Sequence, residues 1–364
     1  MIPVLSFKGK SIAEAWEGAL LLLWQHGTTI QTQYDLEPNT GTVFPPSKDA
    51  MMTMIVENSL AEPRFHVGIP GDPSYFGDYF VEVVEGGRDH WVRKTPDGEE
   101  WPYTYSGRLR EWGNYLNFAW VDEAFGGDSW THLAYRQSGP KEGTFVSHPV
   151  EPFDQISFIV DQLASSPYTR RAVAVTGFPP GDAACDDPPC LRELWLRGHF
   201  VDGIVSVDMH TKWRSRDAWK ASLFNMYAMT EIHREIVGRV RARFDGTDWT
   251  LADCPRCGMN LYRKVANRGD EADNWWCDTQ QQGGHDGKGG CGLSPFDFRV
   301  GAYVDTSDSF HIYGQDHENF EQKFLPITKR PPEKKYWDLS QEPYASMVEE
   351  GRARAKEQIA HKPR

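Results

Sequence analysis

The feature that most constrains the fold is a break in the hydrophobic pattern between Phe244 and Phe298. Over these residues, cysteines, glycines and polar side chains replace the apolar periodicity that core-forming elements need. A chain of 364 residues allows two domains, or one large domain with an insertion. We therefore expect a main domain in two parts and an inserted module, followed by a charged tail. The boundaries are 1–243 and 299–330 for the main domain, 244–298 for the module and 331–364 for the tail.

Four cysteines predict that the inserted module binds structural zinc. Cys254 and Cys257 are two residues apart, as in a zinc knuckle, and Cys277 and Cys291 supply two further thiolates. A module with little core of its own needs the stabilisation that a metal provides. The gap between Cys277 and Cys291 is wide, and His285 within it could replace one ligand. A redox CxxC pair and unpaired thiols are the alternatives, whereas a catalytic zinc would lack an open position.

Charge and composition restrict the functional classes. The 39 Lys and Arg residues are outnumbered by 52 Asp and Glu residues, which gives a net charge of −13. A general nucleic-acid-binding protein needs a basic surface, so we do not expect nucleic acid as a partner. The apolar run from Ala19 to Trp24 is too short to span a bilayer, and no targeting segment is recognisable. We expect a soluble, cytoplasmic protein with no membrane partner.

Local signals predict the main elements. Ser11 and Gly27 carry the start and stop signals of a helix. A hairpin is expected over 194–209, with its turn within 198–203. Apolar side chains at steps of three and four residues predict a long helix over 219–240. Further predictions are a helix over 75–84, strands over 51–56, 144–148 and 172–175, and a partly helical tail on the surface from Pro331.

One cysteine of the main domain lies in a setting that favours catalysis. Cys190 follows a Pro-Pro pair and precedes a predicted strand, so its backbone is restrained. A nucleophilic cysteine needs positive neighbours to ionise near neutral pH, and Arg170, Arg171 and Arg214 are candidates. Arg214 and Ser215 would also suit a phosphate. Each feature also has a simpler interpretation when it is taken alone. Cys190 could be a buried, inert thiol, and Arg170 and Arg171 could be a solvent-exposed pair without a ligand.

The order of these features resembles the thymidylate synthase superfamily. Five short blocks that follow one another in that family occur here in the same order. They are Arg170-Arg171, Pro188-Pro189-Cys190, Arg214-Ser-Arg-Asp217, Phe224-Asn225 and His311-Ile-Tyr313. The stretch Tyr103–Arg110 looks like the family's tyrosine–glycine block in a remote form. The N-terminal half is similar to a divergent branch with archaeal-type synthases and pyrimidine-nucleotide hydroxymethylases.

The resemblance implies a fold, an activity and a co-substrate. The implied fold is an α/β sandwich, with a large mixed sheet through which two subunits pack as a homodimer and the zinc module at its rim. The implied enzyme transfers a one-carbon unit from 5,10-methylenetetrahydrofolate to C5 of a pyrimidine nucleoside monophosphate. Cys190 would attack C6 of the base. Arg214 and Ser215 would hold the 5′-phosphate, with Arg170 and Arg171 reaching it from the other subunit.

The resemblance also implies contacts to the rest of the substrate. Asn225 would bind the edge of the base, and Tyr105 would contribute to substrate binding. His311 and Tyr313 would contact the sugar hydroxyl, and Asp217 would lie near the folate.

The resemblance further implies an acidic residue that manages protons at the base, and the sequence offers two candidates. We assign this role to Glu82, with Glu85 as the alternative. On the competing interpretation, Glu82 is a polar position on a half-buried helix.

Departures from the family's usual pattern leave the substrate and product open. The histidine block, Asp308 to His311, is one residue longer than usual, and the phosphate loop, folate segment and closing tail are not recognisable. Without a recognisable lid to exclude water, we favour hydroxymethylation over the methylation of dUMP to dTMP. Uracil or cytosine, and ribose or deoxyribose, stay open. A non-catalytic zinc protein that binds a nucleotide or another partner is a further alternative.

Overall fold

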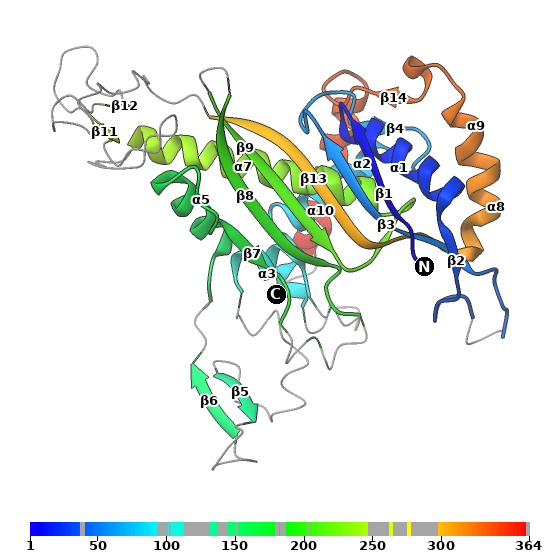
Figure 1. Cartoon of the computed structure of the whole chain (residues 1–364), viewed down its shortest axis with the longest axis horizontal. Coiled ribbons are helices and arrows are strands. Elements are labelled where there is room, and N and C mark those ends of the chain that lie inside the picture. Colours follow the sequence, from blue (N-terminus) through cyan, green and yellow to red (C-terminus); the bar gives the residue numbers. More distant parts are fainter. Residues whose placement is uncertain are drawn as a thin grey trace.

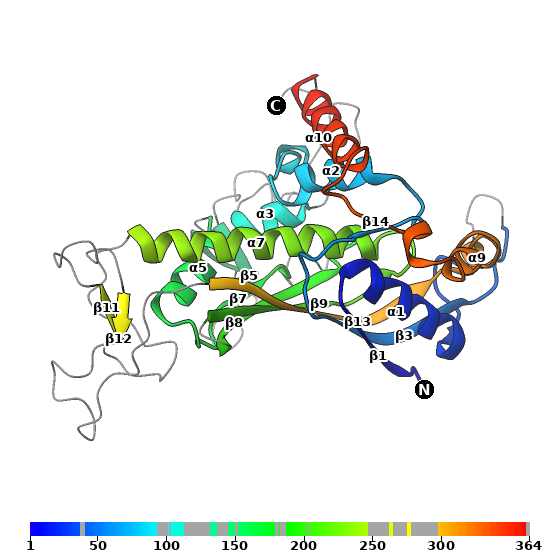
Figure 2. The same ribbon diagram turned by 90° about the horizontal axis from the view of Figure 1, so that it is seen from above.

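The computed structural model describes most of the chain, in several ranges. The residues described are 1–36, 41–92, 101, 103–112, 132–136, 145–149, 152–178, 182, 187–201, 204–246, 262–264, 275–277 and 298–361. At the centre is an eight-stranded mixed sheet, and helices gather on one of its sides (Figures 1 and 2).

The elements have the following bounds. The strands are β1 (Val4–Gly9), β2 (Thr28–Ile30), β3 (Ser47–Val56), β4 (Phe65–His66), β5 (His132–Arg136), β6 (Phe145–Pro149), β7 (Val173–Val175), β8 (Leu191–Val201), β9 (Ile204–Trp213), β10 (Arg216–Asp217), β11 (Tyr262–Lys264), β12 (Trp275–Cys277), β13 (Phe298–Ile312) and β14 (Tyr336–Trp337). The α-helices are α1 (Ile12–His26), α2 (Pro73–Val83), α3 (Tyr105–Arg110), α5 (Gln155–Ser165), α7 (Ser222–Gly246), α8 (His317–Asn319), α9 (Leu325–Thr328) and α10 (Tyr344–His361).

The central sheet joins strands from both sides of the inserted segment. Its order is β1–β3–β13–β9–β8–β7, with β2 beside β3 and β10 beside β13. Strand β13 runs antiparallel to β3 and parallel to β9. Because β13 lies between strands that precede the inserted segment, the chain on both sides of that segment shares one sheet and one core. The expected large mixed sheet is confirmed.

The predicted N-terminal helix is confirmed as α1. The Ser11 side chain accepts a hydrogen bond from the backbone N–H of Glu14 at 3.4 Å, which satisfies one free donor of the first turn. The helix packs on β1 and β3. The indole N–H of Trp16 donates to the carbonyl of Ala218 at 2.8 Å, so α1 is tied to the segment that leads into α7.

The predicted hairpin is confirmed as β8 and β9, and the two strands are joined within the predicted range 198–203. Strand β8 continues through Gly198 to Val201, and β9 begins at Ile204. A Cβ at Gly198 would lie 2.8 Å from the carbonyl oxygen of Pro167. The glycine therefore allows a neighbouring loop to approach the strand rather than forming the turn.

The predicted long helix is confirmed as α7, which lies along the sheet. It packs on β13 and contacts α1, α2 and α5, and α2, α3 and α10 lie on its far side (Figure 2). His233 is fully buried, and its Nε2 lies 2.8 Å from the carbonyl oxygen of Val207. Burial lowers the pKa of His233 to about 4, so the ring is neutral at pH 7 and serves the packing of α7 on the sheet.

The C-terminal segment differs from the expected surface tail. Strand β14 pairs with β4, and α10 packs along α2 (Figure 2). Val348, Gly351 and Ala355 are buried in α10. A Cβ at Gly77 would lie 1.9 Å from the carbonyl oxygen of Val348, and one at Gly351 would lie 1.9 Å from that of Ser74. Buried residues at steps of three and four, two of them small, thus form a narrow stripe, which the charged composition of the tail concealed.

We expect Gly77→Ala to lower the free energy of unfolding by about 1–3 kcal/mol, because the added methyl group would force α2 and α10 apart. Gly238→Ala in α7 is the matched control, since a Cβ there would have no atom of the described residues within 4 Å. Relief of the helical glycine penalty should make this control more stable by up to about 1 kcal/mol. Urea denaturation followed by circular dichroism measures both. Equal changes in the two variants would contradict the close helix contact.

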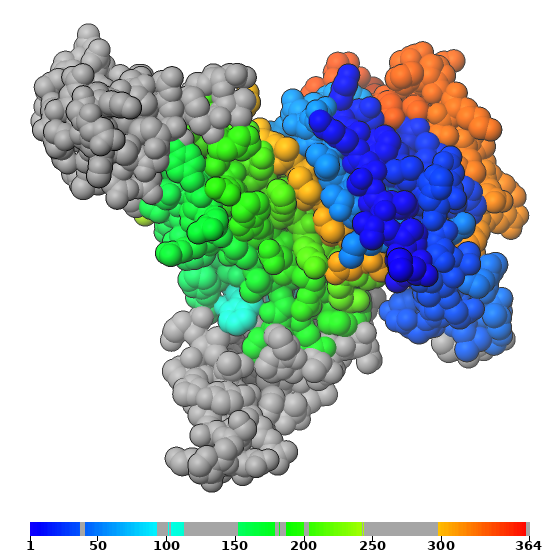
Figure 3. Space-filling view, in the orientation of Figure 1, coloured from blue at the N-terminus to red at the C-terminus, as the bar shows by residue number. Residues whose placement is uncertain are grey.

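The sheet face opposite the helices is covered by no described helix. Figure 3 looks onto this face, which extends from green β8 and β9 through orange β13 to blue β3 and β1. Along β9, Asp208 and His210 are partly exposed on it, whereas Val207 and Met209 point into the core. Among the described helices, none combines the length and the apolar character needed to cross a membrane.

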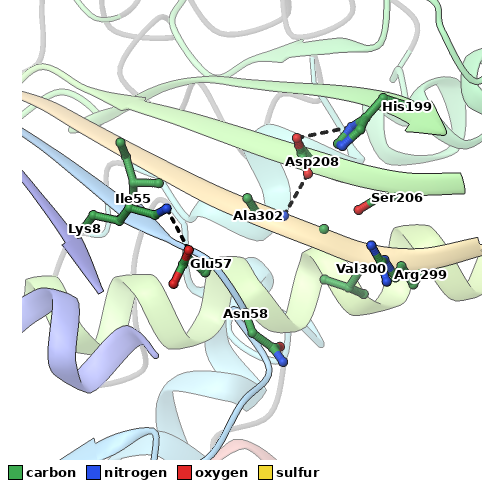
Figure 4. Close-up of a pocket in the computed structure, with 11 residues that line it drawn as sticks. Lys8, Ile55, Glu57, Asn58, His199, Ser206, Asp208, Arg299, Val300 and Ala302 are labelled. Atoms are coloured by element: carbon green, nitrogen blue, oxygen red, sulfur yellow. Dashed lines mark hydrogen bonds and ion pairs between the residues drawn. The ribbon is translucent and has the colours of Figure 1, made fainter. Parts of the chain in front are cut away.

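A pocket of about 540 Å³ opens on this uncovered face (Figure 4). An ion pair stands on each side of it, Lys8 with Glu57 at 2.7 Å and His199 with Asp208 at 3.4 Å. Asp208 also accepts a hydrogen bond from the backbone N–H of Ala302 at 2.8 Å. The lining of the pocket is mixed, because Ile55 and Val300 stand beside these charged groups.

Candidate active site

Cys190 lies half-buried where a loop meets the central sheet. It directly precedes β8, as the sequence predicts, and it packs against the edge of the core. Its carbonyl accepts a hydrogen bond from the backbone N–H of Arg214 at 2.8 Å. This bond joins the start of β8 to the end of β9. Cys190 is the one cysteine whose side chain the structure describes, and it forms no disulfide.

Burial and neighbouring charges oppose each other at the Cys190 thiol. Burial raises its pKa, and Asp187 adds to this effect, whereas Arg214, Arg216 and Arg192 lower it. The net shift is upward, so the thiol form predominates at neutral pH in the unliganded protein. Of the arginines predicted from the sequence, Arg214 thus acts on Cys190, but the positive charges together do not outweigh burial.

Arg170 and Arg171 do not belong to the main charges around the Cys190 thiol. Both are exposed on the loop that precedes β7, and the carbonyl of Arg170 accepts a hydrogen bond from the indole of Trp195 at 3.3 Å. Neither is among the main charges that shift the pKa of Cys190. Within one subunit, the structure therefore does not group this arginine pair with Cys190.

Arg216 is part of a buried polar network. Its guanidinium forms a two-pronged ion pair with Asp305 of β13, with Nη1 2.9 Å from Oδ2. The hydroxyl groups of Tyr303 and Thr211 donate to the same carboxylate oxygen at 2.5 and 3.2 Å. Because Asp305 neutralises it inside the core, Arg216 has a structural role and is not available to a ligand.

Arg214, by contrast, is partly exposed and bound to the loop before Cys190. Its Nη2 donates to the carbonyl of Pro188 at 2.5 Å, and its Nε donates to that of Pro189 at 3.3 Å. The Asp187 carboxylate lies 3.4 Å away. Ser215 follows and is also partly exposed. Since carbonyl groups are weaker partners than an anion, Arg214 could exchange them for a phosphate.

Asp217 begins the turn that leads into α7. Its Oδ1 accepts hydrogen bonds from the backbone N–H groups of Trp219 and Lys220 at 3.0 and 2.8 Å. Burial raises its pKa, while these bonds and the Lys220 ammonium oppose the shift. Asp217 pairs directly opposite His311 across β10 and β13, so the two predicted site residues are neighbours.

His311 and Tyr313 form an aromatic cluster with Tyr34. The ring centroids of His311 and Tyr313 are 4.6 Å apart, and those of Tyr313 and Tyr34 are 5.7 Å apart. Burial raises the pKa of Tyr313, and Asp217, Tyr34 and Cys190 raise it further. Tyr313 therefore lies within electrostatic reach of Cys190, and His311 contacts Tyr313. The two predicted sugar-binding residues are thus close to the candidate nucleophile.

Tyr79 is a site residue that the sequence analysis missed. The side-chain amide of Asn225 on α7 donates to the Tyr79 hydroxyl at 2.6 Å. Burial raises the pKa of Tyr79, and Tyr105, Glu82 and Cys190 raise it further. Tyr79 precedes Glu82 by three residues on α2, so both lie on one helix face. The three-residue spacing from Glu82 was the one feature of the sequence that could have indicated Tyr79 as a site residue.

Tyr103 and Tyr105 complete the cluster of tyrosines around the thiol. Their ring centroids are 5.4 Å apart, and Tyr105 meets the indole of Trp213 edge-on at 5.7 Å. Burial raises the pKa of both phenols, and the Cys190 thiol and Asp187 contribute to each shift. The remote tyrosine–glycine block therefore lies at the candidate site.

The structure separates the two candidate acids. Glu82 is largely buried and receives a hydrogen bond from Arg88 at 2.6 Å. Burial raises its pKa and Arg88 opposes the shift, while Asp78 adds to it. Glu85 is partly exposed and forms an ion pair with Lys356 of α10 at 2.9 Å. Of the two, Glu82 is the one that acts electrostatically on the tyrosine cluster.

The predicted zinc ligands cannot be placed in the same way. Cys254, Cys257, Cys291 and His285 lie outside the described residues, and for Cys277, which ends β12, the backbone alone is described. Within the described ranges, no group of His, Cys, Asp and Glu side chains could hold a metal ion. Structural zinc therefore stays a prediction.

Fold and site together define a class of protein. It is an α/β protein with a mixed sheet, in which a half-buried cysteine lies within electrostatic reach of tyrosine and arginine side chains. A thiol in a polar site of this kind can act as a nucleophile toward a bound ligand.

Archaeal relatives carry the name "Putative thymidylate synthase". The one from Methanosarcina acetivorans is 25% identical over 239 residues, 64% of this chain and 80% of the relative. The one from Methanosarcina mazei is 24% identical over 269 residues, 70% of this chain and 95% of the relative. The one from Methanopyrus kandleri is 37% identical over 86 residues, 24% of this chain and 40% of the relative. A search against protein-family models gave no match.

Among solved structures, thermostable thymidylate synthase A from Bacillus subtilis is similar with a TM-score of 0.43 and 13% identity, over 88% of this chain and 85% of that chain. The sequence relatives carry the assignment, because this structural likeness is distant. These relatives support the thymidylate synthase superfamily, in a divergent branch, as the family that this chain resembles.

Proposed function

We propose that the protein transfers a one-carbon unit from 5,10-methylenetetrahydrofolate to C5 of a pyrimidine nucleoside 5′-monophosphate. The observation that carries this proposal is the half-buried Cys190 beside Arg214, within electrostatic reach of the tyrosine cluster. The Cys190 sulfur adds to C6 of the base, and the electron pair of the C5–C6 bond makes C5 the nucleophile. The folate supplies the one-carbon unit.

The phosphate would bind at the end of β9. Arg214 would exchange the Pro188 and Pro189 carbonyls for phosphate oxygens, and the hydroxyl of Ser215 would donate a further hydrogen bond. Arg170 and Arg171 would reach the same phosphate from a second subunit. Two observations support this assignment. Both arginines are exposed, and within one subunit neither is among the main charges that shift the pKa of Cys190.

The remaining contacts follow from the position of each side chain. Asn225, held by Tyr79, would bind the edge of the base, and Tyr105 would line the site. His311 and Tyr313 would contact the sugar, and Asp217 would lie near the folate.

We propose a 5-hydroxymethyl nucleotide as the product. The name of the relatives favours a second candidate, the methylation of dUMP to dTMP. Mass spectrometry of dUMP, dCMP, UMP and CMP after incubation with the protein and methylenetetrahydrofolate tests both. A hydroxymethyl product supports the first candidate, and a methyl product together with dihydrofolate supports the second. Binding without any product would assign the protein to the non-catalytic alternative.

Glu82→Gln is expected to lower kcat by about 10²–10⁴-fold, the usual contribution of a general acid or base. The substitution keeps the shape and length of the side chain but replaces the titratable carboxyl group by an amide, which can neither give up nor take up the proton. Glu85→Gln is the matched control, because Glu85 is paired with Lys356 away from the site. Steady-state turnover of each variant is the measurement. A larger loss in Glu85→Gln would reverse the assignment.

We further propose that two subunits pack through the uncovered sheet face as a homodimer. Analytical ultracentrifugation should give twice the chain mass. Mixing Cys190→Ala with an Arg170→Ala, Arg171→Ala double variant should restore part of the activity, because a hybrid dimer has one site with both sets of residues. A monomer, or no gain on mixing, would contradict the proposal.

Structural zinc in the inserted module is a separate proposal. Elemental analysis should find one zinc per chain, which is lost in Cys254→Ser and kept in Cys190→Ala. A wild-type protein free of zinc after purification without chelators would contradict it.

A further inference from the structure

Strand β13 contains a bulge directly before His311. Ser307 pairs with Met52 of β3, and Phe310 pairs with Ala50, so three steps along β13 oppose two steps along β3. One extra residue is therefore accommodated, which accounts for the unusual length of the histidine block. Bulges of this kind redirect side chains and occur often beside active sites.

The bulge allows Ser309 to link two residues that stand opposite each other in the sheet. Asp49 of β3 pairs with His311 of β13. The Ser309 hydroxyl donates to Oδ2 of Asp49 at 2.7 Å, and its oxygen lies 3.2 Å from Nδ1 of His311. Both Asp49 and His311 are buried, with exposed fractions of 7% and 5%.

The direction of the first hydrogen bond determines the second. A carboxylate can accept but not donate, so the Ser309 proton points to Asp49. The Ser309 oxygen is then left to accept, and the donor must be the N–H at Nδ1 of His311. Because a neutral imidazole carries one proton, Nε2 has a free lone pair and is an acceptor.

Nε2 of His311 is buried and has no hydrogen-bond partner among the described residues. Burial lowers the pKa of the ring, and Lys220 adds to this effect, whereas Asp49, the Ser309 backbone and Asp35 oppose it. The ring is therefore neutral at pH 7. A buried acceptor without a partner, beside the Tyr313 ring, is suited to a donor from a ligand.

We propose that Asp49 and Ser309 are positioning residues that hold the proton of His311 on Nδ1, so that Nε2 accepts a hydrogen bond from a hydroxyl of the nucleotide sugar. The inference rests on the proposed function for the identity of the ligand. It goes beyond that function by specifying the tautomer of His311 and the two residues that select it.

Binding of dUMP and of 2′,3′-dideoxyuridine monophosphate, measured by calorimetry, tests the contact. The cytidine pair serves equally if cytosine is the preferred base. Wild type should prefer the nucleotide with the hydroxyl by about tenfold or more. Ser309→Ala should reduce this preference to about twofold without changing affinity for the dideoxy compound, whereas Ser309→Thr, which keeps the hydroxyl, should retain it. Ser307→Ala is the matched control, because it removes from the same strand a buried hydroxyl that has no hydrogen-bond partner among the described residues. An unchanged preference in Ser309→Ala would overturn the proposal.

The tautomer can be measured without any ligand. The ¹⁵N chemical shifts of the His311 ring, assigned by comparison with His311→Gln, report which nitrogen carries the proton. Protonated Nδ1 in wild type and a mixture of tautomers in Ser309→Ala would support the inference. Protonated Nε2 in wild type would overturn it. If no nucleotide binds but Nδ1 is protonated, the proposed function fails while the hydrogen-bond chain stands.

Discussion

Cys190→Ala is expected to lower turnover by at least about 10⁴-fold, because removing a nucleophile removes the covalent path altogether. Nucleotide affinity should change by less than about threefold, which corresponds to under about 0.7 kcal/mol, since Arg214, Asn225 and His311 keep their contacts. Product formation by mass spectrometry and nucleotide affinity by calorimetry give the two values.

Cys185→Ala is the matched control, because it removes a second thiol from the same stretch of sequence. It should leave turnover close to wild type. Turnover in Cys190→Ala comparable with wild type would contradict covalent catalysis at this residue.

Arg216→Met is expected to lower the free energy of unfolding by about 3–5 kcal/mol, because it leaves a buried carboxylate unpaired. The carboxylate of Asp305 is fully buried, and its remaining hydroxyl partners do not neutralise its charge. Urea denaturation at pH 7 followed by tryptophan fluorescence measures the loss.

Arg214→Met, two residues earlier, provides the comparison. Arg214 is partly exposed, so stability should fall by less than about 1 kcal/mol. Nucleotide affinity should fall by about tenfold or more, because a charged partner of the phosphate is lost. The pKa of Cys190 should rise, since the Arg214 charge lowers it, and alkylation of the thiol at pH 7.5 should slow. Equal losses of stability in the two variants would contradict the division of roles between the two arginines.

Elements with strong local signals could be predicted from the sequence. The cap at Ser11 and the apolar spacing of α7 act between residues a few positions apart, so they act wherever the helix lies in the fold. The signal at Gly198 was misleading because a turn glycine and a packing glycine look alike in sequence. The contact with Pro167, which distinguishes them, comes from another part of the chain.

The site residues that could be predicted are those that lie in short sequence blocks. Cys190 before a strand and Arg214 at a strand end are where the blocks place them. Tyr79 was missed because a tyrosine on an amphipathic helix is usually a core residue, and its bond to Asn225 spans 146 positions. Asp49 was missed for the same reason, since it is linked to Ser309 across 260 positions.

The sequence by itself predicted the superfamily, a candidate nucleophile and the local helices, because these predictions depend on residue types and spacings along the chain. The tertiary structure alone decided which of two nearby arginines is buried, which of two glutamates lies within electrostatic reach of Tyr79, and how the tail docks. Each of these depends on a partner brought close by folding, such as Asp305, which lies 89 positions from Arg216. Strand register and helix packing set such contacts, and neither is encoded by any short stretch of sequence.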